Sequence, residues 1–186
     1  GLERVRKIVS DLKGFSRVGE SEWQWADLHQ GLESTLNIVW NEIKYKAELV
    51  REYGDLPKVY CIPSQINQVF MNLLTNAAQA ISEYGRIVLR SGSNSGNVWL
   101  EVEDSGSGIA PENLERIFDP FFTTKPVGTG TGLGLSLSWG IVKNHNGSLK
   151  VTSQPGRGTI FRLTLPVQHT LQSSIGTGTT GNSEAS

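Results

Sequence analysis

Residues 63–81 read PSQINQVFMNLLTNAAQAI, and this stretch carries the strongest structural signal in the chain. It begins with a proline, which is tolerated in the first turn of a helix. Its apolar residues recur at spacings of three and four, so the sequence predicts a long helix, from Pro63 to about Ser82, that packs one face on a sheet. The members of this apolar stripe are Ile66, Val69, Phe70, Leu73, Ala77, Ala80 and Ile81.

The opposite side of this helix carries a row of carboxamides. Its members are Gln65, Gln68, Asn72, Asn76 and Gln79, again at three- and four-residue spacing. A polar helix face is usually just solvated, but solvated faces are typically rich in Lys, Glu and Arg. A carboxamide combines a neutral oxygen ligand with a hydrogen-bond donor, which suits a cation bound to phosphates. The row therefore indicates such a site, with a solvated face as the alternative.

The segments around this helix predict further strands and helices. Residues 86–93 and 97–104 alternate apolar and polar residues around a Gly/Ser/Asn turn, which is typical of a hairpin. Residues 47–53 and 58–61 are two more expected strands, joined by the four-residue turn Gly54-Asp55-Leu56-Pro57. The other expected elements are strands at 25–28, 148–154 and 158–165, helices at 29–43 and 133–146, and one helical turn at 111–116.

This order of elements predicts the fold class. In the hairpin, Val98, Leu100 and Val102 are expected to face the core. Helices and strands alternate without a regular βαβ repeat, so we expect an α+β fold. It is a two-layer sandwich of a mixed, mostly antiparallel sheet with helices on one face. Residues 22–166 form this domain.

The two ends of the chain differ from the domain. Residues 2–17 predict an amphipathic helix that begins at Gly1 with no capping residue, as if within a longer element. Its apolar face either docks on the domain or forms half of a helical hairpin or dimer bundle. Residues 167–186 are mostly Ser, Thr, Gly and Gln with little apolar surface, which predicts a disordered tail.

Composition excludes several classes of protein. The formal net charge of −1 lacks the basic footprint of a nucleic-acid-binding protein. The single cysteine, Cys61, precludes an internal disulfide and fits a reducing compartment. No apolar run is long enough to span a bilayer. We expect a soluble, cytoplasmic fragment without membrane contact, whose parent protein is free to carry membrane segments elsewhere.

A first glycine motif follows the expected strand at 97–104. Its sequence is Asp104-Ser105-Gly106-Ser107-Gly108. The motif is either a plain turn or a site in which Asp104 accepts a hydrogen bond from a ligand amine. In the second case Gly106 and Gly108 would let the backbone approach a flat ring.

A second glycine motif, Gly128-Thr129-Gly130-Thr131-Gly132-Leu133-Gly134, leads into the expected helix at 133–146. Backbone amides and the positive end of a helix dipole make an anion site. The motif lacks the Lys and Ser/Thr of a P-loop, and it does not follow the first strand of a βαβ unit. We interpret it as a phosphate site on a mobile loop, with a flexible linker as the alternative.

Between these motifs lies the segment Phe118-Asp119-Pro120-Phe121-Phe122-Thr123-Thr124-Lys125. Its three phenylalanines are unusual in a loop bounded by glycines. They either anchor the loop to the core or present an apolar surface to a partner. Lys125 is placed to reach a phosphate or is simply solvated.

Taken in order, these segments resemble the sequence boxes of the catalytic domain of sensor histidine kinases. Asn72-Leu-Leu-Thr-Asn76 looks like the N box, Asp104-Ser-Gly-Ser-Gly108 like the first glycine box, and Phe118-Asp-Pro-Phe121-Phe122 like the F box. The Gly130–Gly134 segment looks like the second glycine box, and Gly156-Arg-Gly158-Thr159 like the last glycine motif. The superfamily also contains gyrase, Hsp90 and MutL, and the motifs look most like the nitrogen-sensor type.

The resemblance implies the Bergerat ATP-binding fold, with ATP and Mg²⁺ as cofactors. Asp104 would bind the adenine amine, and Thr159 would support the adenine pocket. Asn76 would hold the Mg²⁺ ion, with Asn72 on the same ion or its phosphates. The residues expected to contact the nucleotide are Asp104, Gly106, Gly108, Lys125, Gly128, Gly130, Thr131, Gly132, Leu133, Gly134 and Thr159.

The resemblance also implies the reaction and the partners. Residues 1–18 look like the end of the second helix of a dimerisation hairpin, whose first helix carries the phosphorylated histidine. None of His29, His145 and His169 has the sequence context of that acceptor, so each is expected to be an ordinary surface histidine. A two-component kinase implies a homodimeric parent, a cognate response regulator and signal transduction by phosphorylation.

Two rival functions remain at this point. ATPases of the gyrase and Hsp90 kind carry a glutamate general base four residues before the magnesium asparagine, where this chain has Asn72. A carboxamide cannot take a proton, which argues against efficient hydrolysis. The second rival is a degenerate kinase that binds nucleotide as a scaffold.

Overall fold

The computed structural model describes residues 21–122 and 134–168. Five strands form the main sheet in the order β2-β4-β5-β7-β6, and β1 pairs with β3 in a separate sheet. Only β2 and β4 run parallel within the main sheet. The elements are β1 (Gln24–Ala26), α2 (Leu28–Ile43), β2 (Ala47–Tyr53), β3 (Val59–Cys61), α3 (Pro63–Ala80), β4 (Gly85–Asn94), β5 (Asn97–Asp104), α4 (Pro111–Leu114), α5 (Gly134–Asn144), β6 (Ser148–Gln154) and β7 (Gly158–Pro166).

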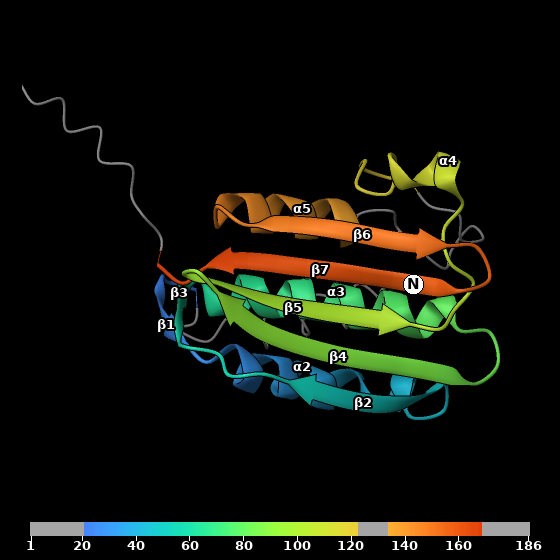
Figure 1. Ribbon diagram of the computed structural model, residues 1–186, viewed down its shortest axis with the longest axis horizontal. Coiled ribbons are helices and arrows are strands. Elements are labelled where there is room, and N and C mark those ends of the chain that lie inside the picture. The colour runs from blue at the N-terminus through green and yellow to red at the C-terminus, as the bar shows by residue number, and fades with distance from the viewer. Residues whose placement is uncertain (1–20, 123–133, 169–186) are drawn as a thin grey trace, which may run out of the picture.

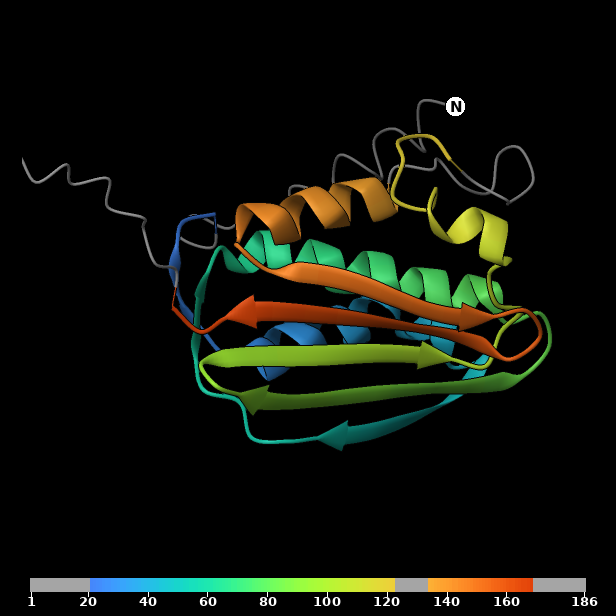
Figure 2. The same ribbon diagram turned by 45° about the horizontal axis from the view of Figure 1, so that its top comes forward.

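The helices form one layer and the main sheet forms the other. Figures 1 and 2 show α2, α3 and α5 side by side on one face of the sheet, with the opposite face uncovered by any described element. The prediction of a two-layer α+β sandwich is therefore confirmed. The hairpin of β4 and β5 is also confirmed, since Ile87 pairs with Asp104 and Asn94 with Asn97.

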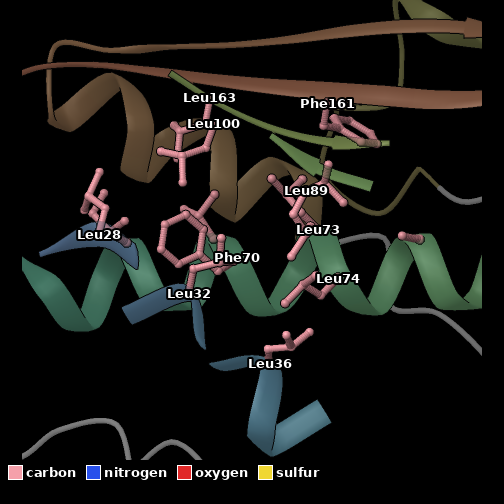
Figure 3. Packing of buried hydrophobic residues seen from close by; sticks show 14 of the residues in the cluster. Leu28, Leu32, Leu36, Phe70, Leu73, Leu74, Leu89, Leu100, Phe161 and Leu163 are labelled. Carbon is pink, nitrogen blue, oxygen red and sulfur yellow. The ribbon is translucent and has the colours of Figure 1, made fainter. Parts of the chain in front are cut away.

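The core lies between the two layers. Leu32 and Leu36 of α2 and Phe70 and Leu73 of α3 are buried against the sheet (Figure 3). The predicted stripe of α3 is largely confirmed, and it also includes Leu74 and Ala78. Burying one such large apolar side chain stabilises the fold by roughly 1.5–3 kcal/mol. Because α3 carries the most extensive buried face, it fixes where its other face, with the carboxamides, points.

The strands expected at 47–53 and 58–61 are present as β2 and β3, but they are not partners of each other. β2 pairs in parallel with β4, whereas β3 pairs with β1 in the small sheet. The backbone amide of Gly54 donates to the carbonyl of Ser91 at 2.9 Å, so the turn remains attached to β4 before the chain departs. Turn residues indicate a change of direction, but they do not say which strand is the partner.

Two boundaries also differ from the sequence-based expectation. The short strand at 25–28 lies at Gln24–Ala26, and Leu28 already belongs to α2, whose N-cap is Asp27. Val167, placed in the tail, is part of the fold: its amide donates to Gly96 and its carbonyl accepts from Tyr60, each at 2.9 Å. The helix expected at 2–17 and the tail beyond Gln168 lie outside the described residues.

The histidines are not all surface residues. His145 is 2 % exposed, and its ring lies tilted against Trp23 with centroids 4.7 Å apart. Its Nδ1 lies 2.7 Å from the carbonyl of Ile141 and its Nε2 accepts from the amide of Ile62. Nδ1 must therefore carry the proton, and the ring joins α5 to the start of α3. The expectation of a surface position is wrong for His145, and His29 is half-buried against Tyr53. His169 lies outside the described residues.

Candidate functional site

Asp104, the last residue of β5, is a buried carboxylate. Its side chain is nearly enclosed, at 4 % exposed, and its Oδ1 accepts from the amide of Gly106 at 2.8 Å. Burial raises the pKa of Asp104 to about 6, although the amides of Gly106 and Thr159 act in the opposite direction. A buried acid with a perturbed pKa is a typical feature of a functional site. The position is the predicted one, at a strand end.

Thr159 lies directly beside Asp104. The two residues are register partners in the β5–β7 pair, and Thr159 is 4 % exposed. The hydroxyl of Thr159 lies 2.8 Å from that of Ser153, which donates to the carbonyl of Gly158 at 2.9 Å and accepts from the amide of Ile109 at 2.8 Å. Ser153 therefore joins two strands to the turn after Asp104. The sequence analysis missed Ser153, since a serine in a strand gives no signal of its own.

Two glycines of the predicted motifs allow close approach of backbone to backbone. A side chain at Gly106 would collide with the carbonyl of Ala80, at the end of α3, and one at Gly158 would collide with the carbonyl of Asp104. Gly158 also has a φ of +103°, which favours glycine. At Gly106 the missing side chain allows the close approach of the end of α3, and its predicted contact with a ligand ring stays a prediction.

Asn72 is hydrogen-bonded to α5. Its Nδ2 donates to the carbonyl of Gly134 at 2.9 Å and to the hydroxyl of Ser138 at 3.0 Å, and its Oδ1 accepts from Gln68 at 3.0 Å. Asn76 is half-buried one turn further along α3. The sequence analysis missed Ser138, although its place four residues after Gly134 puts it on the same side of the helix.

The helix α3 connects these groups along one line. Asn72 contacts the start of α5, Asn76 lies one turn on, and Ala80 accepts from the amide of Ser107 in the turn after Asp104. Eight residues separate Asn72 from Ala80, or about 12 Å of helix. The turn after the buried acid lies at one end of this span and the first turn of α5 at the other. In Figures 1 and 2, the end of β5 and α4 lie at the same end of the molecule.

The F-box phenylalanines divide between the two alternatives that the sequence left open. Phe118 and Phe122 pack against the core, and the guanidinium of Arg116 lies over the Phe122 ring. Phe121 is 72 % exposed and has a φ of +65°, so its side chain points away from the core.

The greater part of the second glycine motif lies outside the described residues. Of its expected nucleotide contacts, the structure describes only Gly134, the first residue of α5. The other expected contacts in this segment lie outside the described residues. They are Lys125, Gly128, Gly130, Thr131, Gly132 and Leu133.

A metal in this site would depend on neutral ligands. Among residues 21–122 and 134–168, no three His, Cys, Asp or Glu side chains gather as a metal cluster. Half-buried carboxamides on α3 fit Mg²⁺ that is bound mainly by phosphate oxygens, because this ion needs few protein ligands.

Among residues 21–122 and 134–168, no helix has the length and apolarity needed to cross a membrane.

A mixed sheet that carries a buried acid at a strand end, opposite a helix that presents asparagines, defines the class of ATP-binding domains shared by kinases and ATPases. The chain belongs to the histidine kinase-, DNA gyrase B- and HSP90-like ATPase family, whose model matches residues 61–169.

Curated relatives of this chain are sensor kinases. It is 36% identical over 170 residues to the sensor histidine kinase ZraS of Escherichia coli, covering 90% of this chain and 36% of that protein. It is 31% identical to sporulation kinase E of Bacillus subtilis, covering 90% of this chain and 23% of that protein. The chain thus spans about a third or less of the length of these relatives.

Solved structures give the same result. The catalytic domain of histidine kinase ThkA, in a nucleotide-free form, superposes with a TM-score of 0.71 at 31% identity, over 78% of this chain and 96% of that one. The mycobacterial sensor histidine kinase MprB superposes with a TM-score of 0.69 at 28% identity, over 78% and 97% of the two chains. The predicted fold and family are therefore confirmed.

Proposed function

We propose that this chain is the ATP-binding kinase domain of a two-component sensor histidine kinase, closest in its motifs to the nitrogen-sensor type. It transfers the γ-phosphoryl group of Mg-ATP to a histidine on a dimerisation helix, in the cytoplasm. The observation that carries the proposal is the line along α3 from Asn72 to Ala80, with the buried Asp104 at one end and α5 at the other.

In this proposal, Asp104 selects the nucleobase of the bound nucleotide. The ionised Asp104 only accepts hydrogen bonds, so it suits the exocyclic amine of adenine. The turn through Gly106, fixed on Ala80, holds the carboxylate in place. Ser153 supports Thr159 on the other side of the base. Gly108 completes the first glycine motif in the same turn.

The other end positions the phosphates. Asn76 is the proposed Mg²⁺ ligand, and a bound ion would offset the negative charge of the transferred phosphoryl group. The N-terminus of α5 would attract the negatively charged phosphates through its backbone amides and its helix dipole. The expected contacts from Lys125, Gly128, Gly130, Thr131, Gly132 and Leu133 stay predictions. Phosphoryl transfer asks little more of the protein than this positioning and electrostatic stabilisation.

The geometry favours transfer over hydrolysis. Asn72, at the position of the general base in the related ATPases, turns its amide nitrogen to α5, within hydrogen-bond distance of the Gly134 carbonyl and the Ser138 hydroxyl. It offers no group that takes a proton from water. The acceptor histidine, the homodimeric hairpin to which residues 1–18 are assigned, and the response regulator complete the proposed system.

The experiment has two parts. Calorimetric titration should give micromolar Mg-ATP binding, on the order of −7 to −8 kcal/mol, which Asp104→Ala abolishes. The chain should then phosphorylate a histidine on a separately supplied hairpin domain of its parent protein and should not label itself. Unchanged affinity in Asp104→Ala would refute the adenine assignment. Binding without transfer to the hairpin would leave the chain a nucleotide-binding scaffold.

A further inference from the structure

Asn72, Ser138 and Gly134 form a closed ring of hydrogen bonds between α3 and α5. Asn72 donates to the carbonyl of Gly134 and to the hydroxyl of Ser138, and that hydroxyl donates to the same carbonyl at 2.8 Å. A carbonyl only accepts, so the amide nitrogen of Asn72 must face α5. The orientation of the side chain is thereby fixed.

Ser138 is fully buried, at 0 % exposed, inside the contact between the two helices. A buried hydroxyl is costly unless it is hydrogen-bonded. Its two partners in the ring meet this need, and they join the first turn of α5 to the middle of α3. The Asn72 side chain also packs beside Gly134, since a Cβ there would lie 3.7 Å from the Asn72 amide carbon, at ordinary van der Waals distance.

This ring sets the place of the α5 N-terminus relative to Asn76. Asn72 and Asn76 are one turn apart on the same face of α3, and Cβ atoms at this spacing lie roughly 5–6 Å apart. Any group bound near Asn76 therefore lies close to the first turn of α5, where the helix dipole favours an anion. A shift of that turn would change the field at the phosphates far more than at the turn after Asp104, which is bonded to Ala80, about 12 Å from Asn72 along α3.

We propose that Asn72 is a positioning residue, which together with Ser138 holds the first turn of α5 against α3 for the phosphates of the nucleotide, and that it is not a metal ligand. The assignment rests on the proposed function of the site. It replaces the expectation that Asn72 binds Mg²⁺ or its phosphates directly, and it adds Ser138, which no metal-binding role would require.

Four variants test this role: Asn72→Ala, Asn72→Asp, Ser138→Ala and the double Asn72→Ala/Ser138→Ala. Gln65→Ala, a carboxamide of the same face, is the matched control. Affinity for Mg-ATP, affinity for adenosine and the Mg²⁺ concentration for half-maximal ATP binding are measured for each variant.

The positioning role predicts that Asn72→Ala and Ser138→Ala each weaken Mg-ATP binding by about threefold to tenfold. The double variant is no weaker than the worse single variant, because both changes break one ring. Asn72→Asp weakens binding too, since a carboxylate cannot donate to the Gly134 carbonyl. Adenosine affinity and the Mg²⁺ requirement stay unchanged, a pattern that a general loss of stability would not give.

Opposite results identify a metal ligand. Normal binding by Ser138→Ala and Asn72→Asp, together with a raised Mg²⁺ requirement in Asn72→Ala, would overturn the positioning role. The two proposals fail separately. If the unaltered chain binds no Mg-ATP, the proposed function falls and takes this role with it. If the unaltered chain binds Mg-ATP and Ser138→Ala binds equally well, only the positioning role falls.

Discussion

The two ends of the site are built in different ways. At the proposed purine end, Asp104 and its neighbours are held mainly by backbone: a strand pair, a turn bonded to the end of α3, and glycines where a Cβ would collide with a carbonyl. At the proposed phosphate end, the side chains of Asn72 and Ser138 join α3 to α5 by bonds to each other and to the carbonyl of Gly134. The first arrangement tolerates almost no change, whereas the second is adjustable by single hydrogen bonds.

This difference matches what each end would do in the proposed site. Recognition of a flat base needs a fixed acceptor, and a buried acid in that role would carry a cost in folding free energy. Phosphates are bound by charge and by many weak donors, so no single side chain there is decisive. Substitutions should therefore have large effects at the purine end and graded effects at the phosphate end.

Asp104→Asn should produce the largest change. We expect a loss of Mg-ATP affinity of at least about 100-fold, because the carboxylate loses its charge and the amide presents donors to the adenine amine. The folded-state pKa of Asp104 is raised from 3.8 to about 6, so burial of the ionised acid costs stability at higher pH. The same variant should therefore be more stable than the unaltered chain at pH 7.5, by up to about 3 kcal/mol.

Urea denaturation without nucleotide measures this gain. The stability contribution of Asp104 is fully present below pH 3.8 and is lost as the pH rises through about 6, so the gain of Asp104→Asn should disappear near pH 4. Equal stability of the two proteins at pH 7.5 would show that the acid is not strained by burial.

Gly158→Ala should have the next largest effect. Its Cβ would overlap the carbonyl of Asp104, and the backbone φ of +103° disfavours alanine. We expect a loss of about 2–4 kcal/mol in the free energy of unfolding, with weaker nucleotide binding. Gly156→Ala is the control: it shares a positive φ but has open space around it, so its loss should be smaller. Equal losses would mean that backbone strain, and not the contact with Asp104, determines the effect.

Binding should also depend on pH through the purine end. Because the pKa of Asp104 is about 6, affinity for adenosine should fall as the pH drops below that value, by about tenfold at pH 5. Adenosine is the suitable probe, since the phosphates of ATP titrate in a similar range. A profile that is flat between pH 5 and 8 would contradict the role of the ionised carboxylate.

Arg90→Ala should have the smallest effect, and it tests whether the site extends to the uncovered face of the sheet. Arg90 lies on the uncovered face of the sheet, where it pairs with Glu52 and Glu103 across neighbouring strands. These pairs are partly exposed, and ion pairs open to solvent contribute little, so we expect a change of at most about 1 kcal/mol in stability and none in Mg-ATP affinity. A change in affinity would extend the site to this face.

The sequence predicted what depends on local pattern. The stripe of α3, the β4–β5 hairpin and the position of Asp104 all follow from periodicity or from turn residues. The pairing partner of β2 does not follow from local pattern, because its parallel pairing with β4 is set by packing between residues far apart in the chain. For the same reason the sequence missed Ser138 and Ser153, and it misplaced His145. Each of them acts through a partner on another element.

One titration tests whether the two ends form a single nucleotide site. Amide resonances of Gly106 and Thr159 report the purine end, and those of Gly134 and Ser138 report the phosphate end. With Mg-ATP, both sets should shift with one dissociation constant, whereas adenosine should shift only the first set. Shifts at the two ends with different dissociation constants, or at one end alone with Mg-ATP, would contradict the account.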